Sequence, residues 1–154
     1  MKINSALLLS FICIQLFACS KNNEVEQTNN VDNISNTDTT KMKITIGSAV
    51  FTATLNNNAT VSAFKAMLPF TITMSELNGN EKFYNFSTTL PTNASSGGNT
   101  QVGDLMLYGN NCLVLFYESF KTSYSYTRLG KIDNTTGLVA ALGAGGVTIK
   151  FEKQ

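Results

Sequence analysis

The chain has 154 residues, a length typical of one domain, and its charge is nearly balanced, with 11 Lys and Arg against 10 Asp and Glu. It has no histidine, which excludes Ser–His and Cys–His nucleophile pairs and histidine-ligated metal sites. Arg128 is its only arginine and no basic cluster is present, whereas nucleic-acid binding needs a concentrated basic surface. We therefore expect no metal, no cofactor and no nucleic-acid partner.

The first residues have the layout of a secretory signal peptide. Lys2 provides a positive start, and an apolar stretch from Ala6 to Phe17 precedes the small residue Ala18. The string Leu-Phe-Ala-Cys that ends at Cys19 resembles the lipobox of bacterial lipoproteins, in which the cysteine is acylated and becomes the first mature residue. An ordinary cleaved signal with an incidental cysteine is the alternative. The resemblance implies a signal peptide over residues 1–18, lipidation at Cys19 and a membrane partner reached through the lipid. It implies a lipid-anchored protein of the bacterial cell envelope, attached to the outer membrane on either its periplasmic or its surface side.

Residues 20–40 are almost entirely Asn, Thr, Ser, Asp and Glu, without aromatic side chains or any period. Such a segment cannot bury enough apolar surface to offset the entropy of ordering it. We therefore predict a flexible, lipidated stalk over residues 19–41 and a folded domain over residues 42–154.

Cysteine usage leaves the folded domain without a disulfide. Cys13 would leave with the signal peptide and Cys19 would carry the lipid, so Cys112 remains alone. Cys112 begins an apolar run, which predicts a small buried hydrophobic side chain in preference to a nucleophile.

The domain begins with a predicted hairpin. Residues 42–46 alternate between apolar and polar, Gly47-Ser48 is a turn, and residues 50–55 return as a second strand. Asn58 is a suitable N-cap for a helix over residues 59–68, which Pro69 ends.

Later elements are short. We predict strands over residues 70–74, 83–86, 104–108, 112–117, 126–132 and 147–151, and a short helix over 138–142 that Gly143 stops. The Gly- and Ser-rich residues 92–100 and the polar residues 121–125 are predicted loops. Short strands without a long βαβ unit favour an antiparallel barrel or sandwich.

Several strings, in their order and spacing, resemble the cyclophilin-like domain of small bacterial proteins, from about Met42 to Phe151. They are AFKAMLP at 63–69, GDLMLY at 103–108, CLVLFY at 112–117 and RLGKI at 128–132. The resemblance implies a mainly β fold: a closed, mostly antiparallel eight-stranded barrel with two short helices and a binding groove on its outer face.

True cyclophilins use such a groove for peptidyl-prolyl cis–trans isomerisation, with a catalytic arginine beside a Phe-Met-Gln surface. This chain departs from that pattern, because the strand from Phe70 to Glu76 has no arginine and no Phe-Met-Xaa-Gln string follows it. The resemblance therefore implies the fold more strongly than the isomerase activity, and no catalytic residue can be assigned.

Two main functions remain open. The first is a membrane-anchored binding module for a peptide or small molecule, with Phe70, Met74, Tyr84, Tyr126 and Arg128 as candidate groove residues, although each aromatic alone is better explained as part of the core or the barrel ends. The second is a peptidyl-prolyl isomerase with a diverged active site, in which Arg128 would be the donor. An adhesive or assembly role would rest only on the anchor and stalk.

Overall fold

A β-hairpin opens the part of the chain that this computed structural model describes, residues 40–154. Strand β1 (Lys41–Ile46) pairs with β2 (Ala49–Leu55) through a turn in which Gly47 has a φ of 59°, a conformation that favours glycine. The predicted signal peptide, Cys19 and nearly all of the predicted stalk lie outside the described residues. The first strand begins at Lys41, one residue before the predicted strand over residues 42–46.

Helix α1 (Ala59–Ala66) follows the hairpin. The side chain of Asn58 accepts a hydrogen bond of 2.9 Å from the backbone N–H of Val61, so Asn58 is the predicted N-cap. The helix ends before the predicted Leu68, because the residue preceding a proline is sterically disfavoured in the helical conformation. No helix in residues 40–154 has the length and apolar character needed to cross a membrane.

The other elements follow in chain order, with one more strand than the sequence predicts. They are β3 (Phe70–Leu77), β4 (Glu81–Asn85), β5 (Ser95–Asn99), β6 (Asp104–Tyr108), β7 (Cys112–Phe116), β8 (Lys121–Ile132), α2 (Leu138–Leu142) and β9 (Val147–Lys153). The predicted strands and the second helix are all present, but β4 begins at Glu81, two residues before the predicted start, and β3 and β9 extend beyond their predicted ends, to Leu77 and Lys153. Strand β5 and the first half of β8 were not predicted.

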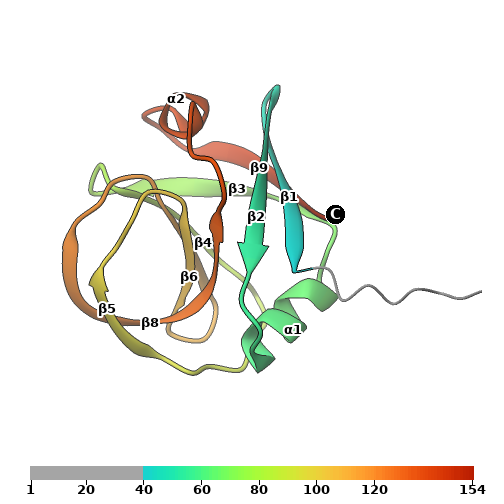
Figure 1. Cartoon of the computed structure of the whole chain (residues 1–154), viewed down its shortest axis with the longest axis vertical. Helices are drawn as coiled ribbons and strands as arrows, with labels where there is room; N and C mark the ends of the chain where they lie inside the picture. Colours follow the sequence, from blue (N-terminus) through green and yellow to red (C-terminus); the bar gives the residue numbers. More distant parts are fainter. Residues whose placement is uncertain (1–39) are drawn as a thin grey trace, which may run out of the picture. The chain divides into compact units, whose positions relative to one another are not determined.

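Eight of the strands form a closed antiparallel barrel, which confirms the expected fold class (Figure 1). The order β2-β1-β9-β3-β4-β7-β6-β8 returns to its start because Ala53, Thr54 and Leu55 of β2 pair with residues 130–132 of β8. Closure removes the free edges that an open sheet would expose. Strand β5 lies outside this ring and pairs with the first half of β8.

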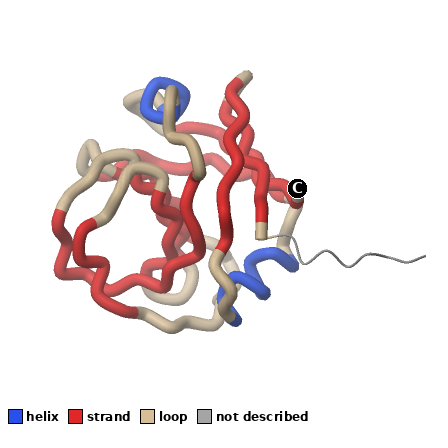
Figure 2. The backbone as a smooth tube through the Cα atoms, viewed as in Figure 1, coloured by secondary structure: helices blue, strands red, loops and turns tan. Residues whose placement is uncertain are grey.

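The predicted loops at 92–100 and 121–125 are wrong, because these two segments pair with each other (Figure 2). Ser95 stands opposite Tyr126, and Asn99 stands opposite Lys121. Gly97 permits the close approach, since a Cβ atom there would lie 2.5 Å from Cγ2 of Thr122. Backbone pairing across the two segments therefore overrides the weak strand propensity of the string SSGGN.

The interior of the barrel is filled by apolar side chains, and the helices contribute to both of its ends. Phe64 of α1 is fully buried against the rings of Phe70, Phe86 and Phe151, with centroid distances of 5.6 to 6.4 Å. The core also includes Leu138 and Leu142 of α2. The two helices lie on opposite sides of the barrel in Figure 1. A packed interior leaves the outer surface as the place for a binding site.

A buried ion pair, which the sequence did not reveal, ties β4 to the segment after α2. Lys82 has no exposed surface, and its Nζ lies 2.5 Å from Oε2 of Glu76. The same ammonium donates to the carbonyl oxygens of Gly143 at 2.9 Å and Gly145 at 2.7 Å, and it lies 5.1 Å from the ring centroid of Tyr117. All of its hydrogen-bonding capacity is therefore used within the fold.

Candidate functional site

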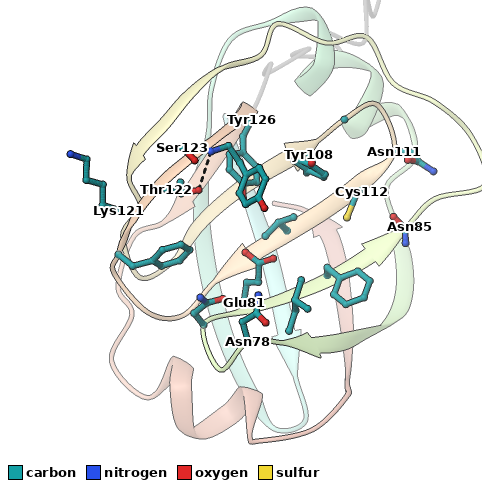
Figure 3. A pocket seen from close by; sticks show the side chains of 17 residues that line it. Asn78, Glu81, Asn85, Tyr108, Asn111, Cys112, Lys121, Thr122, Ser123 and Tyr126 are labelled. Carbon is teal, nitrogen blue, oxygen red and sulfur yellow. Dashed lines mark hydrogen bonds between the residues drawn. The ribbon is translucent and has the colours of Figure 1, made fainter.

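A groove of about 700 Å³ lies on the outer face of the barrel, over β4, β7, β6 and the first half of β8 (Figure 3). The turns on either side of these strands complete it. Its lining comprises Leu77, Asn78, Asn80, Glu81, Phe83, Asn85, Tyr108, Gly109, Asn111, Cys112, Val114, Phe120, Lys121, Thr122, Ser123, Tyr124 and Tyr126.

Strand alternation explains how one set of strands makes both the core and the groove. In β7, Leu113 and Leu115 belong to the interior core, whereas Val114 and Phe116 belong to a second apolar cluster. Met106 and Tyr126 complete this second cluster, whose groove-lining members Val114 and Tyr126 form the apolar floor together with Phe83, Cys112 and Phe120, which pack against it. The floor is therefore a small core of its own on the outer face of the barrel.

Three tyrosines stand together at one side of the groove, and we call Tyr108, Tyr124 and Tyr126 the tyrosine wall. The ring centroid of Tyr108 lies 5.9 Å from that of Tyr124 and 5.5 Å from that of Tyr126. Tyr126 is buried, but Tyr108 is 45% exposed and Tyr124 is 62% exposed. Large aromatic surface left exposed beside a groove is typical of a recognition site.

Glu81 places a carboxyl group in the middle of this apolar surround. Its side chain lies between Asn78 and Tyr126 in Figure 3, yet the residue is only 9% exposed. Within residues 40–154 no hydrogen bond or salt bridge reaches its carboxyl group, and the carboxyl oxygens keep contact with solvent in the groove. Burial, and then the charge of Glu76, raises the pKa of Glu81 above its ordinary value.

The electrostatic effect of Glu81 extends to two neighbours in the groove. Burial comes first and the charge of Glu81 second in raising the pKa values of Tyr126 and of Cys112. These three polar groups therefore face the same space. The raised pKa keeps Cys112 in its thiol form, which is a poor nucleophile. Cys112 is a free, half-buried thiol on the groove surface, more exposed than the buried position that the sequence predicts.

Of the five candidate groove residues, the structure places only Tyr126 in the lining. Met74 has no exposed surface and lies in the interior core, against which Phe70 and Tyr84 also pack. The ring centroid of Phe70 lies 5.0 Å from that of Phe151. The structure thus does not bring Phe70, Met74 and Tyr84 together with Tyr126 in one groove, because they occupy the inward positions of β3 and β4.

Arg128, the fifth candidate, lies on β8 beyond the end of the groove. Its Nη2 donates to the carbonyl oxygen of Gly97 at 3.0 Å, and its Nη1 lies 3.7 Å from Oδ2 of Asp104. The same carboxylate lies 3.8 Å from Nζ of Lys131. Arg128 therefore links β5 to the barrel and helps to hold β5 against Thr122 and Tyr126.

The described residues offer no metal centre, since no group of three or more Cys, Asp or Glu side chains among them is close enough to hold an ion. The site is instead an open groove with an apolar floor, a tyrosine wall and one unpaired carboxyl group. Several amide side chains, including Asn78, Asn85 and Asn111, surround this floor and can bond to a polar ligand.

Comparison with known proteins identifies the family. The model of the cyclophilin-like family matches residues 44–152, which cover the whole barrel. The chain belongs to the cyclophilin-like family. The solution structure of a hypothetical protein from Archaeoglobus fulgidus has the same fold, with a TM-score of 0.54 and 18% sequence identity over 75% of this chain and 95% of that one. No curated protein matches the chain.

The cyclophilin-like family assignment names no residue in the groove. Sequence reasoning missed Glu81, Tyr108 and Tyr124. One signal for Glu81 was available in the sequence. Side chains alternate between the two faces of a strand, so a strand that includes residues 81–85 places Glu81, Phe83 and Asn85 on the same face.

Proposed function

We propose that this cyclophilin-like protein is a binding module of the bacterial envelope, for a peptide or a small molecule. The groove over β4, β7, β6 and β8 is the observation that carries the proposal. Its volume of about 700 Å³ falls in the range of about 300–1,000 Å³ that is typical of ligand sites. An apolar floor with a few convergent polar groups is the usual composition of such sites.

The proposal includes a lipid anchor at Cys19, with residues 20–40 as a tether. It rests on the string from Leu16 to Cys19 and on the apolar stretch before it. Burial of acyl chains contributes about 0.8 kcal/mol per methylene, so two or more chains hold a protein stably on a membrane. The binding module would then act at the membrane surface, in the periplasm or outside the cell.

Binding without catalysis is favoured over prolyl isomerisation by the position of Arg128. An isomerase must lower a rotation barrier of about 18–20 kcal/mol, which requires a donor near the twisted amide. Arg128 is absent from the groove lining, and it is engaged by Gly97 and Asp104. No contact of the described residues favours the isomerase.

The test uses the full chain in a non-ionic detergent and a panel of blocked Gly-Xaa-Gly tripeptides that covers every side chain. Binding is read from amide chemical shifts. The variant Ser123→Trp fills the groove, and Thr71→Trp places the same bulk on the exposed side of β3. We expect one or more peptides to shift groove amides in the wild type and in Thr71→Trp, but not in Ser123→Trp. Shifts that are absent for every peptide, or that Ser123→Trp leaves unchanged, would contradict the proposal.

A further inference from the structure

Glu81 differs from every other acidic side chain in residues 40–154. Glu76 has Lys82, Asp133 has Lys41, Asp104 lies near Arg128 and Lys131, and Glu152 has Lys43 and Lys150. Glu118 is exposed to water. Glu81 alone combines burial with the absence of a cationic partner in the described part of the chain.

The carboxyl oxygens of Glu81 have no partner within residues 40–154 and depend on solvent in the groove, whereas proteins normally pair a mostly buried carboxylate or satisfy it with hydrogen bonds. The neighbouring residue Lys82 cannot be the partner of Glu81, because its ammonium group already donates to Glu76 and to two backbone carbonyl groups. The side chain of Lys82 lies on the opposite face of β4 from Glu81, so it is not available to the groove. The carboxyl group of Glu81 therefore faces the groove without a partner from the described residues, where a ligand can replace the solvent around it.

The surroundings of Glu81 suit a cation with an apolar stem. The three tyrosines of the wall line the same groove as Glu81, and the face of an aromatic ring attracts an ammonium or guanidinium group within about 6 Å of its centroid. Phe83 and Val114 offer apolar contact beside it. Lys121 is part of the lining, but Figure 3 shows its ammonium group pointing away from the groove, so it does not neutralise Glu81.

We propose that the groove recognises an organic cation, a primary ammonium or a guanidinium group, which pairs with Glu81 and packs against the tyrosine wall. This inference rests on the proposed binding function and specifies the chemistry of its ligand. The cation has two sources, a free alkylamine or a lysine or arginine side chain on a peptide. A charge-assisted hydrogen bond to a carboxylate in a desolvated site is stronger than one between neutral groups, which makes Glu81 the main determinant of charge selectivity.

The proposal also sets the direction of the pH dependence. The titratable groups that line the groove with Glu81 are Tyr108 from β6, Cys112 from β7, and Lys121, Tyr124 and Tyr126 from β8, while the charge of Glu76 from β3 acts on Glu81 from outside the lining. Glu76 opposes the ionisation of Glu81, whereas the thiol and the phenol are neutral at neutral pH. Affinity for the cation should thus fall as the pH decreases through the raised pKa of Glu81.

The test compares pairs of probes that differ only in charge. The peptide pair is blocked Gly-Lys-Gly and the same peptide with norleucine in place of lysine, and the small-molecule pair is n-butylamine and n-butanol. Binding to the full chain in detergent is measured from tyrosine fluorescence and from the amide shifts of β4 and β8. The variant Glu81→Gln removes the charge while keeping the size, and Glu118→Gln is the matched control on an exposed carboxylate.

We expect the cationic member of at least one pair to bind about tenfold or more tightly than its neutral partner, and Glu81→Gln to abolish this preference while Glu118→Gln keeps it. If Gly-Lys-Gly binds more tightly than its norleucine partner while n-butylamine binds no better than n-butanol, the cation belongs to a peptide. If only n-butylamine shows the preference, the cation is a small amine. Equal binding of charged and neutral probes, unaffected by Glu81→Gln, would overturn the cation inference and leave the binding function intact. If none of these four probes shifts the groove amides, the cation inference is overturned. The binding function itself is then decided by the full Gly-Xaa-Gly panel described above.

Discussion

The ammonium of Lys82 is enclosed by the barrel at 2.5 Å from the carboxylate of Glu76, and no part of the lysine reaches solvent. Glu76 in turn accepts hydrogen bonds from the hydroxyl group of Tyr117 at 2.7 Å and from the backbone N–H of Gly79 at 2.8 Å. Burial raises the pKa of Glu76, but the hydrogen bonds from Lys82, Tyr117 and Gly79 outweigh it, so the net shift is downward. Burial and the hydrogen bond to Glu76 raise the pKa of Tyr117 to about 12.

Replacement of Lys82 tests this link. Lys82→Met leaves Glu76 without its cationic partner and two carbonyl groups without the ammonium donor, so we expect a loss of about 3–5 kcal/mol in the free energy of unfolding. Urea denaturation measures it. Lys153→Met, at an exposed position on the last strand, should change stability by less than about 0.5 kcal/mol. Equal effects of the two substitutions would contradict a structural role for Lys82.

Lys82 is expected to stabilise the fold, whereas Glu81 is expected to destabilise it at neutral pH. Because its pKa is raised in the folded state, the folded protein binds more protons than the unfolded chain at pH values just above the ordinary 4.5. Stability therefore falls as the pH rises through that window, and the cost of ionising Glu81 is present at neutral pH. We expect Glu81→Gln to be more stable than the wild type at neutral pH, with the difference shrinking below pH 4.5.

Denaturation curves of both proteins at the two pH values provide the measurement, with Glu118→Gln as the exposed control. A large loss of stability in Glu81→Gln at neutral pH would show that the carboxylate has a structural partner. A gain would agree with a group kept for binding at a cost in stability.

Gly97 sets how closely β5 approaches the groove. In Gly97→Ala the new Cβ atom would lie 2.5 Å from Cγ2 of Thr122 and 3.0 Å from Cδ2 of Tyr126. We expect a loss of about 1–3 kcal/mol and faster amide hydrogen exchange in β5. Gly145→Ala is the control, since nothing lies within 4 Å of a Cβ atom there. Unchanged exchange in Gly97→Ala would mean that β5 moves aside without cost.

The isomerase alternative has a direct kinetic test. A proline-containing peptide should isomerise in the presence of the wild-type protein at its uncatalysed rate, over tens to hundreds of seconds. Arg128→Ala should leave that rate unchanged, because Arg128 lies outside the groove lining. An acceleration by the wild type that Arg128→Ala removes, with folding retained, would promote catalysis to the main function.

The lipid anchor is tested at Cys19. We expect Cys19→Ser to prevent acylation, so that the protein accumulates as an unprocessed precursor or as a species released from membranes by washing. Incorporation of labelled fatty acid and membrane fractionation measure this, with Cys112→Ser as the control. Labelling of Cys19→Ser at the wild-type level would contradict the anchor.

Much of the barrel follows from local pattern. The alternation in residues 42–46 and 147–151 predicts two strands, and the structure pairs Ile44 with Phe151 on the inner face. Asn58 and Gly143 marked a helix start and a helix end for simple stereochemical reasons. These features depend on neighbouring residues in the chain, so the sequence displays them directly.

The site is harder to predict because it depends on which strands become neighbours. Glu81 and Tyr126 lie 45 positions apart, and only the β4-β7-β6-β8 order brings them to one face. Strand β5 has little intrinsic strand propensity and exists through its pairing with β8. Phe70 and Met74 resembled recognition residues in composition, but the phase of β3 turns both inward.

The alternation along β7 has a consequence for how such proteins diverge. Leu113 and Leu115 determine whether the barrel folds, whereas Cys112 and Val114 determine what the groove contacts, and the two pairs interleave along a single strand. Substitution at the groove-facing positions of the strand can thus change ligand preference while the core positions, which determine folding, stay the same. Members of one family can share a scaffold and still have unrelated ligands.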